Sequence, residues 1–199
     1  HKMAERSRMT RAYLIAARRS PIAPRGGALA HLDLHALTTP VLAAVLADAG
    51  LTADDIGELI VSNALGAGGN PARITALGAG FPNRIAGLSI DRQCAGGLDA
   101  LILADAMIRS GQHDIVVAGG VESYSRRPLR AHRFADGRAP EPYEQARFTP
   151  WPDRDPDMAQ AAGQLAQDLG ISRAAQDDWA RASHAKARIT PEIVPVAGL

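Results

Sequence analysis

The sequence predicts an α/β fold with a mostly parallel sheet and helices on both of its faces. Short apolar runs that end in turn residues alternate along the chain with longer segments that carry apolar residues at helical spacing. The order strand, helix, strand, helix repeats, which is typical of parallel strands joined by helical crossovers. With 199 residues, the chain is long enough for one such domain with a substantial core.

The first strand and the first helix are predicted close to the N-terminus. AYLIAA at 12–17 is a short apolar run, and the turn-forming pair Ser20-Pro21 follows it, which suits a buried strand of a parallel sheet. Leu34 to Ala49 carries apolar residues at helical spacing. Gly50 then supplies the residue type that most often follows the end of a helix.

The middle of the chain predicts three more strands and two more helices. Strands are expected at 58–65, 87–91 and 114–118, where short apolar runs reach turn residues. Helices are expected at 71–79, which opens on a proline, and at 96–110, which ends before a glycine. The helix at 96–110 is apolar nearly all round, so we expect it to be a central buried helix.

The pattern changes after the fourth expected strand. Residues 124–157 are rich in proline and arginine without sustained periodicity, which predicts an excursion from the core that serves as a lid or an oligomer contact. Helices return at 158–169 and 172–187, the second with Ser172 as its N-cap. EIVPV at 192–196 is expected to be a final edge strand, because its proline cannot donate to a ladder.

These elements divide the chain into four parts. Residues 1–10 are polar and are expected to be a leader or a cloning remnant outside the fold. Residues 11–123 form the predicted core, 124–157 the excursion, and 158–199 the remaining helices and the last strand.

Composition excludes several classes of partner. Apolar residues make up 46% and charged residues 22%, close to the average of globular proteins, and no apolar run is long enough to cross a bilayer. The net charge of +1 gives no basic excess for nucleic acid or an anionic membrane. A single cysteine cannot form an internal disulfide, and no secretory signal pattern precedes the first strand, so we expect a cytoplasmic protein.

The histidines do not predict a metal site. Four of them lack the spacing to a cysteine or a second histidine that zinc sites show, so no metal is expected: His31, His35, His113 and His132. His184 lies in a polar helix between charged residues and is expected to be a surface or capping residue.

Cys94 is the only cysteine and lies where a predicted strand ends and a helix begins. At that place its sulfur should face unpaired backbone N–H groups and the positive end of the helix dipole, which favours a nucleophilic thiolate. Gly96 and Gly97 would let a substrate approach the sulfur closely. The alternative is that Cys94 is a buried small hydrophobe, the usual place of a lone cysteine. Because strained turns are found mostly at functional sites, the sharp turn favours the first interpretation.

A known family matches these residues. SIDRQCAGGLDALILADAMIRSGQHDIVVAGGVESYSRRP at 89–128 resembles the thiolases, which include acetyl-CoA acetyltransferases and 3-ketoacyl-CoA thiolases. Three further stretches agree in order: NPARITALGAGFP at 70–82, SHAKA at 183–187 and EIVPV at 192–196. The resemblance implies that the fold is thiolase-like, that 11–123 is the N-terminal thiolase core, and that the chain corresponds to the N-terminal half of the family.

The resemblance also implies a function and its residues. Cys94 would be the catalytic residue that is acylated by an acyl-coenzyme A, with an oxyanion hole formed in part by its backbone N–H. Met158 matches a substrate-binding methionine that lines the acyl pocket, although a helical methionine is more often core filler. Coenzyme A and acyl-CoA would be substrates, with no permanently bound cofactor. The same resemblance implies a homodimer or homotetramer that would act in fatty acid metabolism.

The C-terminal half of the family pattern does not appear. The sequence has no Gly-His-Pro segment and no second cysteine in a Cys-x-Gly setting, so it lacks the base and the second thiol that turnover needs. We therefore expect these residues alone to be inactive. Three explanations stay open: a shortened form, further residues outside this sequence, or a natural half that pairs with another subunit. The rival hypothesis is a noncatalytic thiolase-like subunit or scaffold that needs a partner chain. Acyl-chain preference and the direction of the reaction also stay open.

Overall fold

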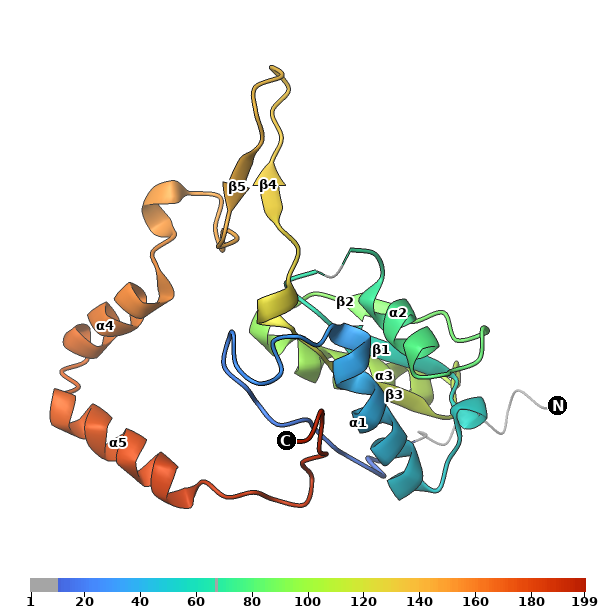
Figure 1. The fold of residues 1–199 in the computed structure, drawn as a ribbon. Coiled ribbons are helices and arrows are strands. Elements are labelled where there is room, and N and C mark those ends of the chain that lie inside the picture. The colour runs from blue at the N-terminus through green and yellow to red at the C-terminus, as the bar shows by residue number, and fades with distance from the viewer. Residues whose placement is uncertain (1–10, 67) are drawn as a thin grey trace. The chain divides into compact units, whose positions relative to one another are not determined.

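The structure is a computed structural model, and it describes residues 11–66 and 68–199. These residues form two units, which Figure 1 shows with their elements: one contains the chain up to Pro128 together with Pro191–Leu199, and the other is Leu129–Thr190. The expected leader or remnant at 1–10 lies outside the described residues. The second unit is thus inserted between two segments that belong to the first.

The centre of the first unit is a three-stranded parallel sheet with the strand order β2-β1-β3. It consists of β1 (Glu58–Ser62), β2 (Leu88–Ile90) and β3 (Val116–Gly120). Both neighbours run parallel to β1, so the carboxyl ends of all three strands meet at one edge of the sheet. The α/β fold class and three of the predicted strands are confirmed, although β1 and β2 are shorter than predicted and β3 lies two residues further along.

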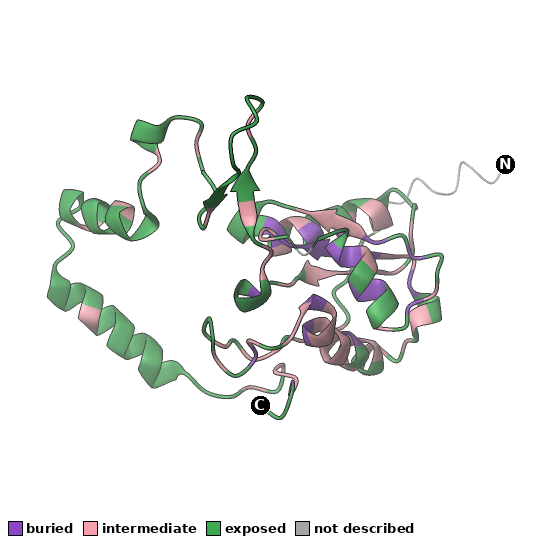
Figure 2. Cartoon of the chain, turned by 45° about the horizontal axis from the view of Figure 1, so that its top comes forward, coloured by how far each residue is buried: buried purple, intermediate pink, exposed green. Residues whose placement is uncertain are grey.

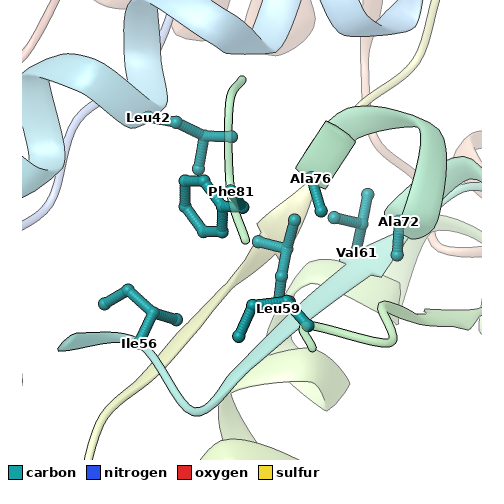
Figure 3. Packing of buried hydrophobic residues seen from close by; sticks show 8 residues of the cluster. Leu42, Ile56, Leu59, Val61, Ala72, Ala76 and Phe81 are labelled. Atoms are coloured by element: carbon teal, nitrogen blue, oxygen red, sulfur yellow. The ribbon is translucent and has the colours of Figure 1, made fainter. Parts of the chain in front are cut away.

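Helices cover both faces of this sheet, as predicted. α1 (Leu34–Ala49) and α2 (Pro71–Gly78) lie on one face, and α3 (Gly96–Arg109) lies on the other. The side chains of β1 alternate between the two faces, as in any strand. Leu59 and Val61 belong to the cluster of α1 and α2, whose members Figure 3 shows, and Ile60 packs against α3. A further cluster of Leu29, Leu37 and Val196 joins the C-terminal segment to α1.

The helix ends follow their local sequence. The Asp33 side chain accepts a hydrogen bond from the Ala36 N–H at 3.1 Å and caps α1. Gly50 ends the same helix with a φ of 65°, in the left-handed region that glycine tolerates best. Asn70 caps α2, and Pro71 occupies its first position. The predicted helices of this unit are confirmed, α1 at both ends to the residue.

The predicted strands at the two ends of the chain are wrong. Neither 12–17 nor 192–196 forms a strand. One isolated parallel bridge joins Arg19, which follows the first segment, to Ile193 in the second. Leu14 is 76% exposed, in contrast to the buried position predicted for it. A strand requires a partner along its length, and among the described residues 12–17 pairs with none. An apolar run indicates that a segment could be buried in a sheet. It does not provide the neighbouring strand with which the segment would have to pair.

The prediction that 96–110 is a central buried helix is also wrong for these residues. Gly96, Ala100 and Ala104 of α3 are buried against the sheet. Leu98 is 63% exposed and Ile102 is 56% exposed, because the sheet covers only one side of the helix. Apolar residues extend round more of α3 than the single face that this unit buries.

The second unit consists of a hairpin followed by two helices. β4 (Arg130–His132) and β5 (Glu141–Tyr143) pair antiparallel, with the His132 and Tyr143 rings stacked 4.5 Å apart between centroids. α4 (Met158–Asp168) and α5 (Arg173–Lys186) confirm the two predicted helices, and Ser172 caps α5 as predicted. No residue of α4 or α5 is buried among the described residues, and Figure 2 shows nearly this whole unit as exposed.

The described residues also contain four short 3₁₀ helices. They are η2 (Ala53–Asp55), η3 (Gln93–Ala95), η4 (Tyr124–Arg126) and η5 (Pro152–Arg154). Of these, η3 leads directly into α3 and contains the only cysteine of the sequence.

Candidate active site

Cys94 lies in the turn that connects β2 to α3, as the sequence predicts. β2 ends at Ile90, and η3 carries the cysteine to the first residue of α3, Gly96. The residue is exposed. The alternative that Cys94 is a buried small hydrophobe is therefore wrong, and the thiol is accessible to a reagent or a substrate.

The turn that presents Cys94 is strained at the residue before it. Gln93 has a φ of 49°, a left-handed conformation that costs a non-glycine residue about 1–2 kcal/mol. The Asp91 carboxylate holds this turn, because it accepts a hydrogen bond from the Gln93 N–H at 2.7 Å. Such strained strand-to-helix turns present exposed nucleophiles in α/β-hydrolases. The geometry fits the same use for Cys94.

The N-terminus of α3 differs from those of the other helices in the described part of the chain. The helices α1, α2, α4 and α5 each have a side-chain cap, whereas α3 has no side-chain hydrogen bond at its cap. Backbone N–H groups and the positive end of the helix dipole attract negative charge at such an end. In the first turn, the Asp99 carboxylate forms an ion pair with Arg92 at 2.7 Å.

Gly96 and Gly97 have different surroundings. A Cβ added to Gly96 would overlap the Ser62 hydroxyl oxygen and would lie 2.8 Å from the Ser62 Cβ. The sequence predicts that Gly96 keeps the approach to the sulfur open. In the structure, its missing side chain instead allows α3 to pack closely on β1. A Cβ added to Gly97 would meet nothing within 4 Å. Room for a substrate beside Gly97 stays a prediction.

Backbone hydrogen bonds connect the carboxyl ends of the three strands next to this turn. The Asn63 N–H donates to the Ile90 carbonyl at 3.0 Å, and the Val121 N–H donates to the Ser62 carbonyl at 3.0 Å. These bonds join the end of β1 to the ends of β2 and β3. Sequence reasoning missed Ser62 and Asn63, although their polarity at the end of the apolar run ELIV was the signal that could have found them.

Glu122 and Ser123 stabilise the same edge. The Glu122 carboxylate accepts hydrogen bonds from the Asn63 side-chain amide at 2.5 Å and from the Ala64 N–H at 2.7 Å. The Ser123 hydroxyl donates to the Leu32 carbonyl at 3.1 Å. These contacts give both residues a structural role at the carboxyl ends of the strands.

Met158 lies in the other unit. It is the first residue of α4, and it is 63% exposed. It is thus not core filler in the described residues. Its contact with an acyl group stays a prediction.

The histidines of the described residues belong to no cluster that could hold a metal ion. His184 is exposed, and its Nδ1 lies 2.9 Å from the Ala180 carbonyl oxygen of its own helix, so the prediction of a surface residue is confirmed. No three side chains of the metal-binding types come together among the described residues. No helix in the same residues is both long and apolar enough to span a membrane.

Comparison with known families decides which proteins share this arrangement. The sequence model described as "Thiolase, N-terminal domain" matches residues 12–197. The chain belongs to the thiolase family. The match includes the Cys94 turn, the whole sheet and both helices of the second unit, so the thiolase resemblance of the sequence is confirmed.

Curated thiolase relatives are about twice as long as this chain. The chain is 38% identical over 179 residues to "Putative acetyl-CoA C-acetyltransferase VraB" of Staphylococcus haemolyticus, covering 88% of this chain and 47% of that protein. It is 36% identical over 198 residues to the protein of the same name from Staphylococcus aureus strain MRSA252, covering 94% and 52%. The thiolase chain therefore spans about half the length of these relatives.

Solved thiolase structures agree with the fold. The acetyl-CoA acetyltransferase of Bacillus anthracis matches with a TM-score of 0.78 and 33% identity, over 89% of this chain and 46% of that one. The Acat5 thiolase of Ascaris suum, solved in complex with coenzyme A, matches with a TM-score of 0.78 and 27% identity, over 89% and 48%. The thiolase-like α/β architecture is confirmed.

Proposed function

We propose that this thiolase chain provides the acyl-accepting cysteine of an acyl-CoA C-acyltransferase that cleaves or forms 3-ketoacyl-CoA. The observation that carries the proposal is the exposed Cys94 thiol, presented by a strained turn at the N-terminus of α3. Membership of the thiolase family supports acyl transfer as the reaction class. The chain spans about half of the length of its curated relatives, so the proposal concerns the activity of a complete thiolase and not of these residues alone.

In the cleavage direction, the Cys94 sulfur attacks the 3-keto carbon of the substrate and forms a new C–S bond. The bond between C2 and C3 breaks, and the electron pair leaves with the acetyl-CoA fragment, which takes up a proton. The sulfur of a second coenzyme A then attacks the acyl carbon, and the electron pair of the breaking bond returns to Cys94 as a thiolate. Synthesis is the reverse of these steps.

Two features of this chain serve the reaction. The backbone N–H of Cys94 is the donor that we assign to the oxyanion formed when its sulfur attacks, and the dipole of α3 favours the same negative charge. We assign the base for the cysteine and the acid for the leaving carbon to groups outside these residues, since the sequence has no second cysteine and no Gly-His-Pro segment.

Coenzyme A and acyl-CoA are the substrates in this proposal, with no resident cofactor or metal. The Ascaris suum thiolase solved with coenzyme A supports that substrate class. Met158 is proposed to line the acyl pocket. We further propose a homodimer or homotetramer, located in the cytoplasm and acting in fatty acid metabolism.

The test is thiolysis of acetoacetyl-CoA by the full-length protein, with Cys94→Ala and Cys94→Ser as variants. We expect both to lose activity by about a thousandfold or more, because alanine has no nucleophile and a serine hydroxyl stays protonated at neutral pH. Incubation of the unaltered protein with acetyl-CoA should add one acetyl group to the peptide that contains Cys94, as read by mass spectrometry. Ser183→Ala, an exposed substitution in α5, is the control and should keep full activity.

Two results would overturn the proposal. Thiolysis that persists in Cys94→Ala would place the nucleophile elsewhere. A full-length protein with no CoA-dependent activity, whether or not Cys94 is present, would instead favour the noncatalytic subunit.

A further inference from the structure

Ser62 at the end of β1 fills the space beside Gly96 at the start of α3. The Ser62 side chain is buried, with 6% of the residue exposed, and it occupies the space that a side chain at position 96 would need. A Cβ on Gly96 would overlap Ser62 Oγ and lie 2.8 Å from Ser62 Cβ, whereas the next atom, Ser62 Cα, is 4.0 Å away. The serine side chain alone therefore limits how closely the helix approaches the strand at this point.

Ser62 is held in place from both sides. Its carbonyl accepts the Val121 N–H at 3.0 Å, and the next residue, Asn63, donates to the Ile90 carbonyl at 3.0 Å. Ser62 is also paired in register with Ile90 of β2 and with Gly120 of β3. Because two neighbouring strands fix the Ser62 backbone, we expect a clash at its side chain to displace the helix end instead.

The displaced segment would carry Cys94 with it. Gly96 is the first residue of α3, and η3 with Cys94 at its centre joins it without a break. The same helix end also approaches β3 closely, because a Cβ on Gly120 would lie 3.9 Å from the Gly97 Cα and 3.3 Å from the Ser62 carbonyl oxygen. Ser62 is thus the point where the end of the sheet supports the turn that presents the thiol.

We infer that Ser62 is a positioning residue for Cys94. Its side chain acts as a steric stop for α3, and the contact fixes the distance between Cys94 and the carboxyl ends of the strands. The inference rests on the proposed role of Cys94 as the nucleophile. A misplacement of about 1 Å in a reacting group lowers rates by about a hundredfold, so the contact acts on the reaction rate without touching the substrate.

A graded set of variants in the full-length protein tests this stop. Gly96→Ala creates the clash. The double variant Gly96→Ala with Ser62→Ala leaves the contact with the residue 62 Cβ at 2.8 Å, and Gly96→Ala with Ser62→Gly leaves only the residue 62 Cα, at 4.0 Å. The readout is the rate at which iodoacetamide alkylates Cys94, followed by peptide mass mapping across a pH series. Gly163→Ala, a glycine of α4 with nothing within 4 Å of an added Cβ, is the matched control.

We expect alkylation of Cys94 to slow by about tenfold or more in Gly96→Ala, with a changed pH profile. The rate should recover partly in the double variant with Ser62→Ala and to within about twofold in the one with Ser62→Gly, and Gly163→Ala should leave it unchanged. Equal alkylation rates and pH profiles across the series would overturn the inference, even if thermal stability varied.

A second measurement keeps the test decisive if Gly96→Ala does not fold. Ser62→Ala alone removes the hydroxyl and creates no clash, and we expect it to lower kcat by several-fold while KM stays constant, with Ser62→Cys as the conservative rescue. Unchanged kcat in Ser62→Ala would count against the stop. Alkylation of Cys94 requires no acyl transfer. A protein without thiolase activity would therefore contradict the proposed function, while the alkylation series would still test the role of Ser62.

Discussion

The Glu122 carboxylate joins the segment after β3 to the end of β1, because it accepts a hydrogen bond from the Asn63 side-chain amide at 2.5 Å. It also accepts the Ala64 N–H at 2.7 Å, which holds the first residues of the loop that follows β1. Hydrogen bonds to a charged acceptor are shorter and stronger than neutral ones. This pair therefore stabilises the edge of the sheet on which the Cys94 turn rests.

Replacing Glu122→Gln should destabilise the protein. The amide keeps the shape but loses the charge and one acceptor oxygen, so we expect a loss of about 1–3 kcal/mol in the free energy of unfolding. Chemical denaturation measures this loss. Asp114→Asn, an exposed carboxylate of the same unit, serves as the control and should change stability by less than about 0.5 kcal/mol. Equal effects of the two variants would contradict the prediction.

Gly87→Ala should be among the most destabilising alanine substitutions of the first unit. Its φ is 81°, and an added Cβ would lie 2.6 Å from the Arg73 backbone nitrogen and 2.8 Å from the Ala72 carbonyl carbon. Because backbone atoms of α2 cannot move aside cheaply, we expect a loss of about 3 kcal/mol or more. Gly50→Ala separates the two causes, since its φ is 65° with nothing within 4 Å; it should cost about 1–2 kcal/mol. Thermal unfolding would disprove the prediction if both variants melted together.

The ion pair between Arg18 and Asp48 should make stability depend on pH in acid. The hydrogen bond from Arg18 lowers the pKa of Asp48 below its ordinary value of 3.8, and the attraction of the two charges adds to it. A lowered pKa means that this contribution is complete above pH 3.8 and is lost as the pH falls through the lower folded-state pKa.

Asp48→Asn should therefore flatten the acid limb of the stability curve below about pH 4. The measurement is the denaturation midpoint at a series of pH values. Arg18→Gln should flatten the same limb, and the double variant should add nothing further to that pH dependence. Arg18 also donates to the Pro191 carbonyl, so its loss should in addition loosen the C-terminal segment at every pH. An unaltered acid limb in Asp48→Asn would rule out the pair as its source.

The Ser172 cap should stabilise α5 locally. Its hydroxyl accepts the Ala175 N–H at 3.2 Å, and none of the helix residues is buried, so the helix depends on such local bonds. We expect Ser172→Ala to cost about 1 kcal/mol of helix stability, measured as faster amide hydrogen exchange in α5. Ser183→Ala, within the same exposed helix, should leave the exchange unchanged or slow it slightly.

Helices and their ends could be predicted from the sequence because their causes are local. α1 begins and ends where Asp33 and Gly50 predict, since a cap needs only a neighbour three or four residues away. The place of Cys94 between a strand and a helix followed from the same kind of pattern. The turn before it is strained at Gln93, as its sharpness suggested.

By itself, then, the sequence determined the fold class, the helices, the thiol at a strand-to-helix turn and the resemblance that the family match confirms. Only the tertiary structure decided that 12–17 and 192–196 lack a ladder, that α3 keeps an exposed apolar side, and that Gly96 faces Ser62. The physical reason is distance along the chain. Periodicity and caps act within a few residues, whereas strand pairing and helix-on-sheet contact depend on which distant segment supplies the neighbouring surface.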